Sequence, residues 1–159
     1  MNLVYINSSN GLSKAALETV TYAKKLGGDV TVITNGSASA EQLANLGVYG
    51  ASVVLQDASV DGQDPGQLVK MVAAAAQKVS ASTIIFSHDL TGKAVAPRLS
   101  VRIKAGLVAG AVALPEADNS IKVNVFSGKA FGFVKVNSAQ RIISLLPNSI
   151  QPEQTGSNC

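Results

Sequence analysis

The chain has 159 residues, 47% of them hydrophobic and 14% charged, which is typical of one globular domain and excludes a disordered or fibrous chain. Its one Cys, Cys159, excludes a disulfide framework and a Cys-rich metal site. Residues 1–80 carry five basic and six acidic residues, whereas residues 81–159 carry eight basic and four acidic ones. This surplus is small and lacks interleaved aromatic residues, so nucleic-acid binding is not expected. With no membrane-length apolar run and no signal segment, we expect a cytoplasmic domain without membrane insertion.

Short apolar runs alternate with helix-like segments through the first two thirds of the chain. Hydrophobic residues spaced by three and four mark the helical segments, and Ser13 is a suitable N-cap for the first of them. Near-continuous apolar strands separated by helices predict a parallel sheet covered on both faces. The sequence predicts strands over residues 3–6, 30–33, 52–55 and 83–86, and helices over residues 13–26, 39–46, 68–79 and from the loop after residue 86 to residue 104.

The start of that last helix is open because Pro97 lies within it. If Thr91 is the N-cap, Pro97 falls in the second turn and kinks the helix. Alternatively, the regular helix starts at Pro97, where the missing N–H costs nothing.

The pattern changes after Gly106, where helical spacing disappears. Residues 107–114 form a long apolar run, and Ile121, Val123 and Val125 alternate with Lys122, Asn124 and Phe126. Two further strands are predicted over residues 131–136 and 141–146, which together suggest an antiparallel C-terminal meander at one edge of the sheet.

Two small polar loops follow the first and fourth predicted strands. In open α/β sheets, ligands bind beyond the carboxyl ends of the strands, where the strand order reverses. Each loop also opens a helix whose N–H groups could receive an anion, so the crevice would suit a phosphate or an adenosine. The alternative is that these side chains only cap their helices. The candidate crevice residues are Ser8, Ser9, Asn10, Gly11, Thr91, Gly92 and Lys93.

Residues that carry chemistry are few. His88 is the one His, and its sequence neighbour Asp89 need not face it, so a loop-satisfying role is expected. No dinucleotide fingerprint or P-loop is present, and no nucleophile is paired with a base. The acidic loop from Asp57 to Asp64 lacks EF-hand spacing, so no metal site is expected. The four cations between Lys93 and Lys104 form either a solvated helix flank or an anion or partner site.

The segment Gly92–Leu99 (GKAVAPRL) resembles the stretch of Gly, a basic residue and Ala-Pro-Arg-Leu in the N-terminal domain of the electron transfer flavoprotein alpha subunit. Weaker matches occur in the expected order: KLGGDV with a following Gly36, GASVVL, and SGKA. The similarity extends over residues 1–150. Residues 147–150 (PNSI) are similar to the family's closing segment, although Leu146 and Ile150 stand where the family has Arg and an aromatic residue.

By this resemblance, residues 1–150 form a three-layer α/β/α, Rossmann-like domain of adenine-nucleotide-hydrolase type, a scaffold that packs on a beta subunit. The resemblance also implies a heterodimer that carries electrons on FAD from flavin dehydrogenases, such as acyl-CoA dehydrogenases, to a membrane quinone reductase. Residues 151–159 would be a linker or tail before the domain that holds the FAD contacts. We therefore expect this chain to supply no FAD-binding and no catalytic residue.

In the family, AMP belongs to the beta subunit, so the polar crevice would be a vacated nucleotide site. Arg98 and Arg102 are the candidate contacts to the beta subunit, and an unpaired domain could self-associate through its exposed partner surface. The alternative function is a stand-alone adenine-nucleotide-binding domain of the universal-stress type. That class carries a Gly-rich phosphate loop after a late strand, which this sequence lacks.

Overall fold

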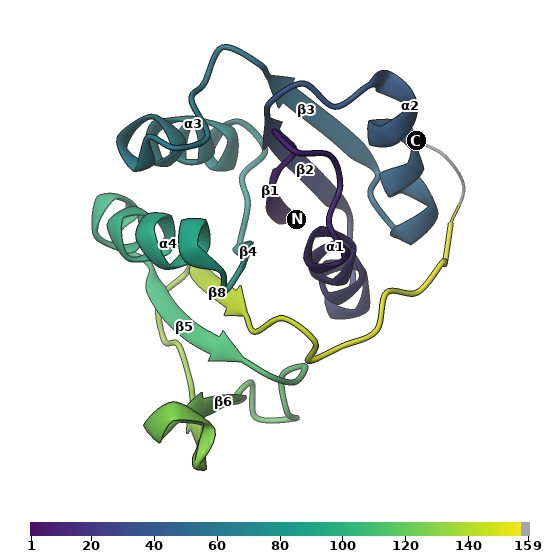
Figure 1. The fold of residues 1–159 in the computed structure, drawn as a ribbon. Helices are drawn as coiled ribbons and strands as arrows, with labels where there is room; N and C mark the ends of the chain where they lie inside the picture. Colours follow the sequence, from purple (N-terminus) through teal and green to yellow (C-terminus); the bar gives the residue numbers. More distant parts are fainter. Residues whose placement is uncertain (157–159) are drawn as a thin grey trace.

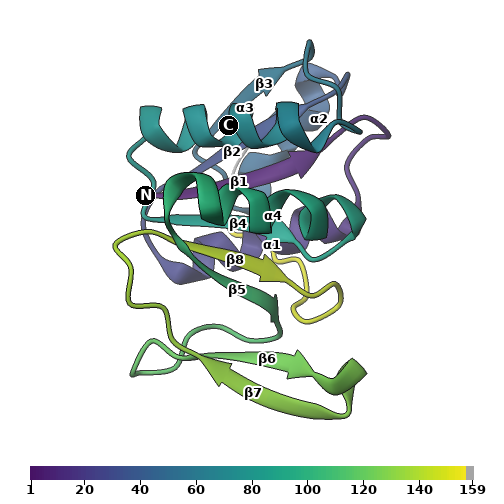
Figure 2. The same cartoon turned by 90° about the vertical axis from the view of Figure 1, so that its left-hand side faces the viewer.

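A computed structural model describes residues 1–156. Its centre is one eight-stranded sheet in the order β3-β2-β1-β4-β8-β5-β6-β7 (Figures 1 and 2). The strands are β1 (Asn2–Asn7), β2 (Val30–Asn35), β3 (Val53–Asp57), β4 (Thr83–Ser87), β5 (Gly106–Ala111), β6 (Ile121–Val125), β7 (Ala130–Val134) and β8 (Arg141–Leu145). The helices are α1 (Lys14–Leu26), α2 (Ala40–Ala44), α3 (Pro65–Lys78) and α4 (Leu90–Ile103), with 3-10 turns η1 (Asn45–Tyr49) and η2 (Phe126–Gly128).

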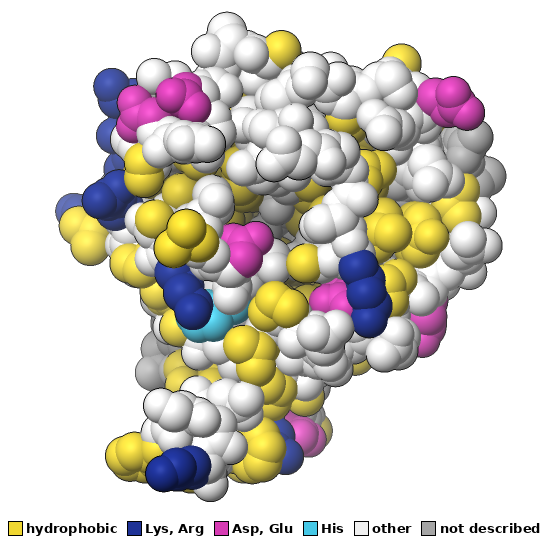
Figure 3. Space-filling model, in the orientation of Figure 1, with side chains coloured by type: hydrophobic (Ala, Val, Ile, Leu, Met, Phe, Trp, Pro, Cys, Tyr) yellow, Lys and Arg dark blue, Asp and Glu magenta, His cyan; other side chains and the backbone are white. Residues whose placement is uncertain are grey.

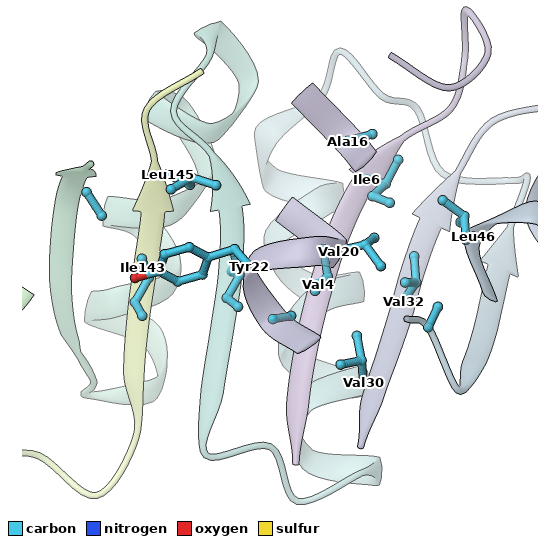
Figure 4. Close-up of a cluster of buried hydrophobic side chains, with 14 of the residues drawn as sticks. Val4, Ile6, Ala16, Val20, Tyr22, Val30, Val32, Leu46, Ile143 and Leu145 are labelled. Carbon is cyan, nitrogen blue, oxygen red and sulfur yellow. The ribbon is translucent and has the colours of Figure 1, made fainter. Parts of the chain in front are cut away.

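The three-layer α/β/α prediction is confirmed. The first four strands are parallel, and α3 and α4 lie on one face of the sheet while α1 lies on the other (Figure 2). One apolar cluster joins the sheet to α1, where Val20 and Tyr22 pack on Val4 and Ile143 (Figure 4). A second cluster joins the opposite face to α3 and α4. Successive side chains of the buried strands therefore point alternately into two hydrophobic cores, one on each face of the sheet.

The predicted edge meander is confirmed for β6 and β7 and wrong for β8. β6 pairs antiparallel with β5 and β7, and β7 is the edge strand. β8 is instead parallel to both neighbours and lies between β4 and β5. Its residues Ile142 and Ile143 are both fully buried, one on each face, which is the pattern of a central parallel strand.

The structure corrects the start of α4. Asp89, not Thr91 or Pro97, is the N-cap, and its carboxylate accepts from the Gly92 N–H at 2.8 Å. Pro97 lies inside the helix. At α1 the prediction is confirmed, because Ser13 caps the helix by accepting from the Ala16 N–H.

The segment after β8 runs along α1 as an extended strap (Figure 1). The Asn148 N–H donates to Glu18 at 3.1 Å, and the Glu153 N–H donates to the Thr21 hydroxyl at 3.1 Å. Lys25 and Glu153 form an ion pair of 2.7 Å. The predicted tail is thus attached first to α1 and then, through the Thr155 and Gly156 N–H groups, to the Val48 carbonyl of η1; its end, with Cys159, lies outside the described residues.

Among residues 1–156, none of the helices has both the length and the apolar character needed to cross a membrane.

Candidate functional site

The strand order reverses between β1 and β4, as expected, so the loops after these strands flank the carboxyl edge of the sheet. The cavity at this point has a volume of about 40 Å³. That space accommodates a few water molecules and no nucleotide. Its lining consists of Tyr5, Ile6, Asn7, Ser13, Ala16, Thr19, Ser87, Asp89, Thr91 and Gly92.

The loop after β1 uses its polar groups within the chain. The Ser8 hydroxyl is buried, donates to the Asn35 carbonyl at 2.5 Å and accepts from Thr34 at 2.9 Å. The Tyr5 hydroxyl donates to the Asn35 side chain at 2.7 Å. Burial, with a smaller contribution from the charge of Asp89, raises the Tyr5 pKa far above its usual range. These residues tie β1 to β2. Of the predicted group, Ser9 and Asn10 are exposed and Gly11 is half-buried.

The loop after β4 has a carboxylate where an anion would bind. Asp89 occupies the N-terminus of α4, so a phosphate there would meet a negative charge. A Cβ on Gly92 would overlap the Ser87 carbonyl oxygen, so this glycine is required for the close packing of α4 on the end of β4. Thr91 is half-buried, and Lys93 is exposed.

A wider hollow of about 370 Å³ lies next to this cavity, between α4 and the loop before α3. Gly62 of that loop packs so closely on Asn35 that a Cβ there would overlap the amide nitrogen. The lining is amide and apolar, with no Lys or Arg among its residues: Asn7, Gly62, Gln63, Pro65, Leu68, Leu90, Thr91 and Ala94. A nucleotide would find no cation here to pair with its phosphates.

FAD, which the family resemblance places in a second domain, does not fit the residues at this sheet edge. The cavity at the switch point is too small, and both helix N-termini beside it already have side-chain caps, Ser13 and Asp89. The predicted loops are therefore brought together as expected, in an arrangement suited to holding the sheet edge together.

His88 has a partner on a distant strand that no local sequence pattern indicates. Its Nδ1 lies 2.7 Å from the hydroxyl of Ser144 on β8. Partial burial and the nearby Lys93 charge lower the His88 pKa, against an opposing effect of Asp89. Ser144 is only 1% exposed, and its contact with His88 joins the loop after β4 to β8.

The carboxylates of the acidic loop from Asp57 to Asp64 accept hydrogen bonds from the loop itself. Asp57 accepts from the Ser59 N–H and hydroxyl, and Asp61 accepts from the Gln63 N–H. Hydrogen bonds from Ser59 lower the Asp57 pKa. Within residues 1–156, no three His, Cys, Asp or Glu side chains are grouped to hold a metal ion.

Arg98 and Arg102 are both exposed on α4. Arg102 lines a hollow of about 410 Å³ between α3 and α4, which also includes Lys70 and Gln140. Both arginines are therefore accessible to a partner, as the sequence analysis requires.

The β6–β7 hairpin carries an exposed aromatic surface that is not among the predicted site residues. Three of the four Phe residues of the chain lie there with large exposed fractions: Phe126 at 80%, Phe131 at 57% and Phe133 at 60%. Phe126 also has a φ of 50°, which bulky residues rarely adopt. Figure 3 shows apolar side chains gathered around a basic one on the lower protrusion, where Figure 1 places β6. The alternation of Phe131 and Phe133 was visible in the sequence.

Three relatives of the chain are named as electron transfer flavoprotein subunits. The chain is 24% identical over 152 residues to the electron transfer flavoprotein subunit alpha of Bacillus subtilis, a match covering 90% of this chain and 46% of the relative. It is 25% identical over 129 residues to the corresponding subunit of Syntrophomonas wolfei, a match covering 79% of this chain and 38% of the relative. A protein of Escherichia coli K12 named for an electron transfer flavoprotein subunit is 28% identical over 154 residues, covering 96% and 48%.

The chain thus spans less than half the length of these curated relatives. The family model of the electron transfer flavoprotein domain matches residues 2–158. Nearly the whole chain is included in that match, and the fold agrees with it. The chain therefore belongs to the electron transfer flavoprotein domain family.

Proposed function

We propose that this chain is the scaffold and subunit-interaction domain of an electron transfer flavoprotein alpha subunit. The observation that carries the proposal is the family match over residues 2–158. The carboxyl edge of the sheet is consistent with a scaffold, because its polar groups bind one another around a cavity of about 40 Å³. In this proposal the chain performs no chemistry of its own.

The whole protein would pair this chain with a beta subunit in the cytoplasm. FAD would be held outside residues 1–150, in the second domain of the alpha subunit, and residues 151–159 would lead toward it. The heterodimer would carry electrons from flavin dehydrogenases, such as acyl-CoA dehydrogenases, to a membrane quinone reductase. The support for these steps is the family membership together with the poor fit of FAD to this sheet edge.

The alternative, a stand-alone nucleotide-binding domain, is separated from this proposal by titration. We expect the purified chain to be colourless and to bind neither FAD nor ATP tightly, because Asp89 caps α4 and the switch-point cavity is small. Isothermal titration calorimetry with ATP, on the wild type and on Lys93→Ala, measures this directly. A sub-micromolar ATP affinity that Lys93→Ala abolishes would favour the alternative.

Subunit pairing is tested with the beta subunit encoded by the same genome. We expect the wild-type chain to co-purify with it, and Arg98→Glu with Arg102→Glu to weaken the affinity by about tenfold, since charge reversal at an interface costs binding energy. The control is Lys24→Glu on α1 with Lys78→Glu on α3, where both lysines are also exposed and neither lines the hollow that contains Arg102. Equal affinity for all three proteins would identify Arg98 and Arg102 as ordinary surface residues.

A further inference from the structure

The helical layer on the α3–α4 face does not cover the whole sheet. α3 and α4 lie over the strands up to β8 and the start of β5, and in Figure 2 no helix lies in front of β6 and β7. On this side, Ala109 of β5 and the two strand phenylalanines of β7 are exposed. The α3–α4 face of β5, β6 and β7, called here the open face, thus lacks a covering layer within the described chain.

The register shows that the phenylalanines belong to this face. Paired residues of neighbouring strands point to the same side of a sheet. Lys122 pairs with Phe133, and Asn124 pairs with Phe131. Ile121 and Val123, which alternate with Lys122 and Asn124 along β6, are buried in the opposite core with α1. One face of the hairpin is therefore buried within the chain, and the other presents aromatic rings to solvent.

The width of the open face fits one helix. Neighbouring strands lie about 4.8 Å apart, and packed helices lie about 8–10 Å apart, so three strands offer room for one helix beside α4. A helix in that place would continue the α3–α4 layer and cover Phe131 and Phe133.

The charges around the open face indicate which side chains a binding partner must present there. The Lys122 ammonium lies 4.1 Å from the centre of the Phe131 ring. Lys93 lies close enough to His88 to lower its pKa, and Lys104 lies two residues before the start of β5. Among the described residues, none of these three lysines has a carboxylate within 4.0 Å. Residues 121–136 contain three Lys and no Asp or Glu. A second copy of this face would place Lys against Lys, which is unfavourable, whereas a partner with carboxylates complements it.

We propose that the open face is the docking surface for the beta subunit, which covers it with a helix bearing an apolar stripe flanked by carboxylates. This proposal rests on the subunit pairing proposed above and names the surface where it occurs. Exposed aromatic residues on a rigid sheet are the side chains that contribute most to binding at such interfaces.

The test uses the full chain with the beta subunit encoded by the same genome. Phe131→Ser with Phe133→Ser should weaken the affinity at least about 30-fold, because two aromatic contacts are lost at the centre of the interface. Lys122→Glu should weaken it by about tenfold, with the loss largest at low salt. The matched controls are Val53→Ser, at the opposite edge of the sheet, and Lys78→Glu on α3, both exposed and both expected to bind as the wild type does. Circular dichroism confirms that each variant is folded.

The outcomes separate this proposal from the proposed function. If the wild type does not bind the beta subunit, the subunit pairing and this surface are both wrong. If the wild type binds and the double Phe variant binds equally well, only the open face is wrong. If the wild type alone dimerises, and the double Phe variant is monomeric with undiminished beta-subunit affinity, the occupant is a second copy and the proposal is overturned.

Discussion

We expect Gly92→Ala to lower the free energy of unfolding by about 3 kcal/mol, the upper end of the range for adding one methyl group to a packed site. The added Cβ would overlap the carbonyl oxygen of Ser87, which is backbone and cannot rotate away. α4 would have to shift from the end of β4, weakening the Asp89 cap at the Gly92 N–H. Urea denaturation followed by circular dichroism measures the change.

Gly132→Ala is the matched control for that experiment. Gly132 also has an ordinary φ, and a Cβ there would be 3.7 Å from Val123, a normal contact. Its stability should stay within about 0.5 kcal/mol of the wild type. If instead Gly92→Ala leaves stability unchanged and weakens ATP binding, Gly92 serves a ligand, and the structural role assigned to it is wrong.

Glu18→Ala should lower the free energy of unfolding by about 2–3 kcal/mol and release the strap after β8. The Glu18 side chain is buried, accepts from the Asn148 N–H at 3.1 Å and lies 3.6 Å from the Lys14 ammonium. Its removal leaves that amide without its acceptor and leaves space in a packed region, and each effect costs stability. Amide hydrogen exchange at residues 148–156 should be faster in the variant than in the wild type, and the exchange rates elsewhere in the protein should change less.

Glu116→Ala is the control for Glu18, because Glu116 is an exposed carboxylate in the loop before β6. It should change the free energy of unfolding by less than about 0.5 kcal/mol. A Glu18→Ala protein with wild-type stability and wild-type exchange at residues 148–156 would show that the strap does not depend on this carboxylate.

Most of the fold could be predicted because its signals are local. Apolar runs and helical spacing identified the first four strands and their helices, and the hydroxyl of Ser13 marked the start of α1. The start of α4 was missed because Asp89, Thr91 and Pro97 all suit a helix start, and only the three-dimensional contact with the Gly92 N–H selects Asp89.

The place of β8 could not be derived from chain order, because strand pairing is a long-range property. Strands that follow one another without a helix usually pair as antiparallel neighbours. The sequence did hold a signal against that arrangement, since Ile142 and Ile143 are adjacent apolar residues, whereas Ile121, Val123 and Val125 alternate with polar ones. A central strand is buried on both faces and therefore has adjacent apolar residues, whereas a strand that is buried on one face alternates apolar and polar residues.

The position of the candidate site could be predicted from the sequence, but the hydrogen-bond partners of its polar groups could not. Strand order placed the loops after β1 and β4 together, but which polar groups are free depends on contacts between distant residues. Ser8 is satisfied by Asn35, and His88 by Ser144. The exposure of the hairpin phenylalanines likewise depends on how far across the sheet the helices extend, and no local sequence pattern shows that α4 leaves β6 and β7 uncovered.

The position of β8 also sets an order of events for folding. β4 and β5 do not pair with each other, so β1–β4 and β5–β7 are joined in the sheet only through β8, the strand of this sheet that comes last in the sequence. During synthesis from the N-terminus, the earlier strands must wait, with their edges open, until residues 141–145 have been made. Contacts between such distant segments are slow to form. The nascent sheet therefore stays in two parts until residues 141–145 are available, and during that interval its unpaired strand edges are open to aggregation.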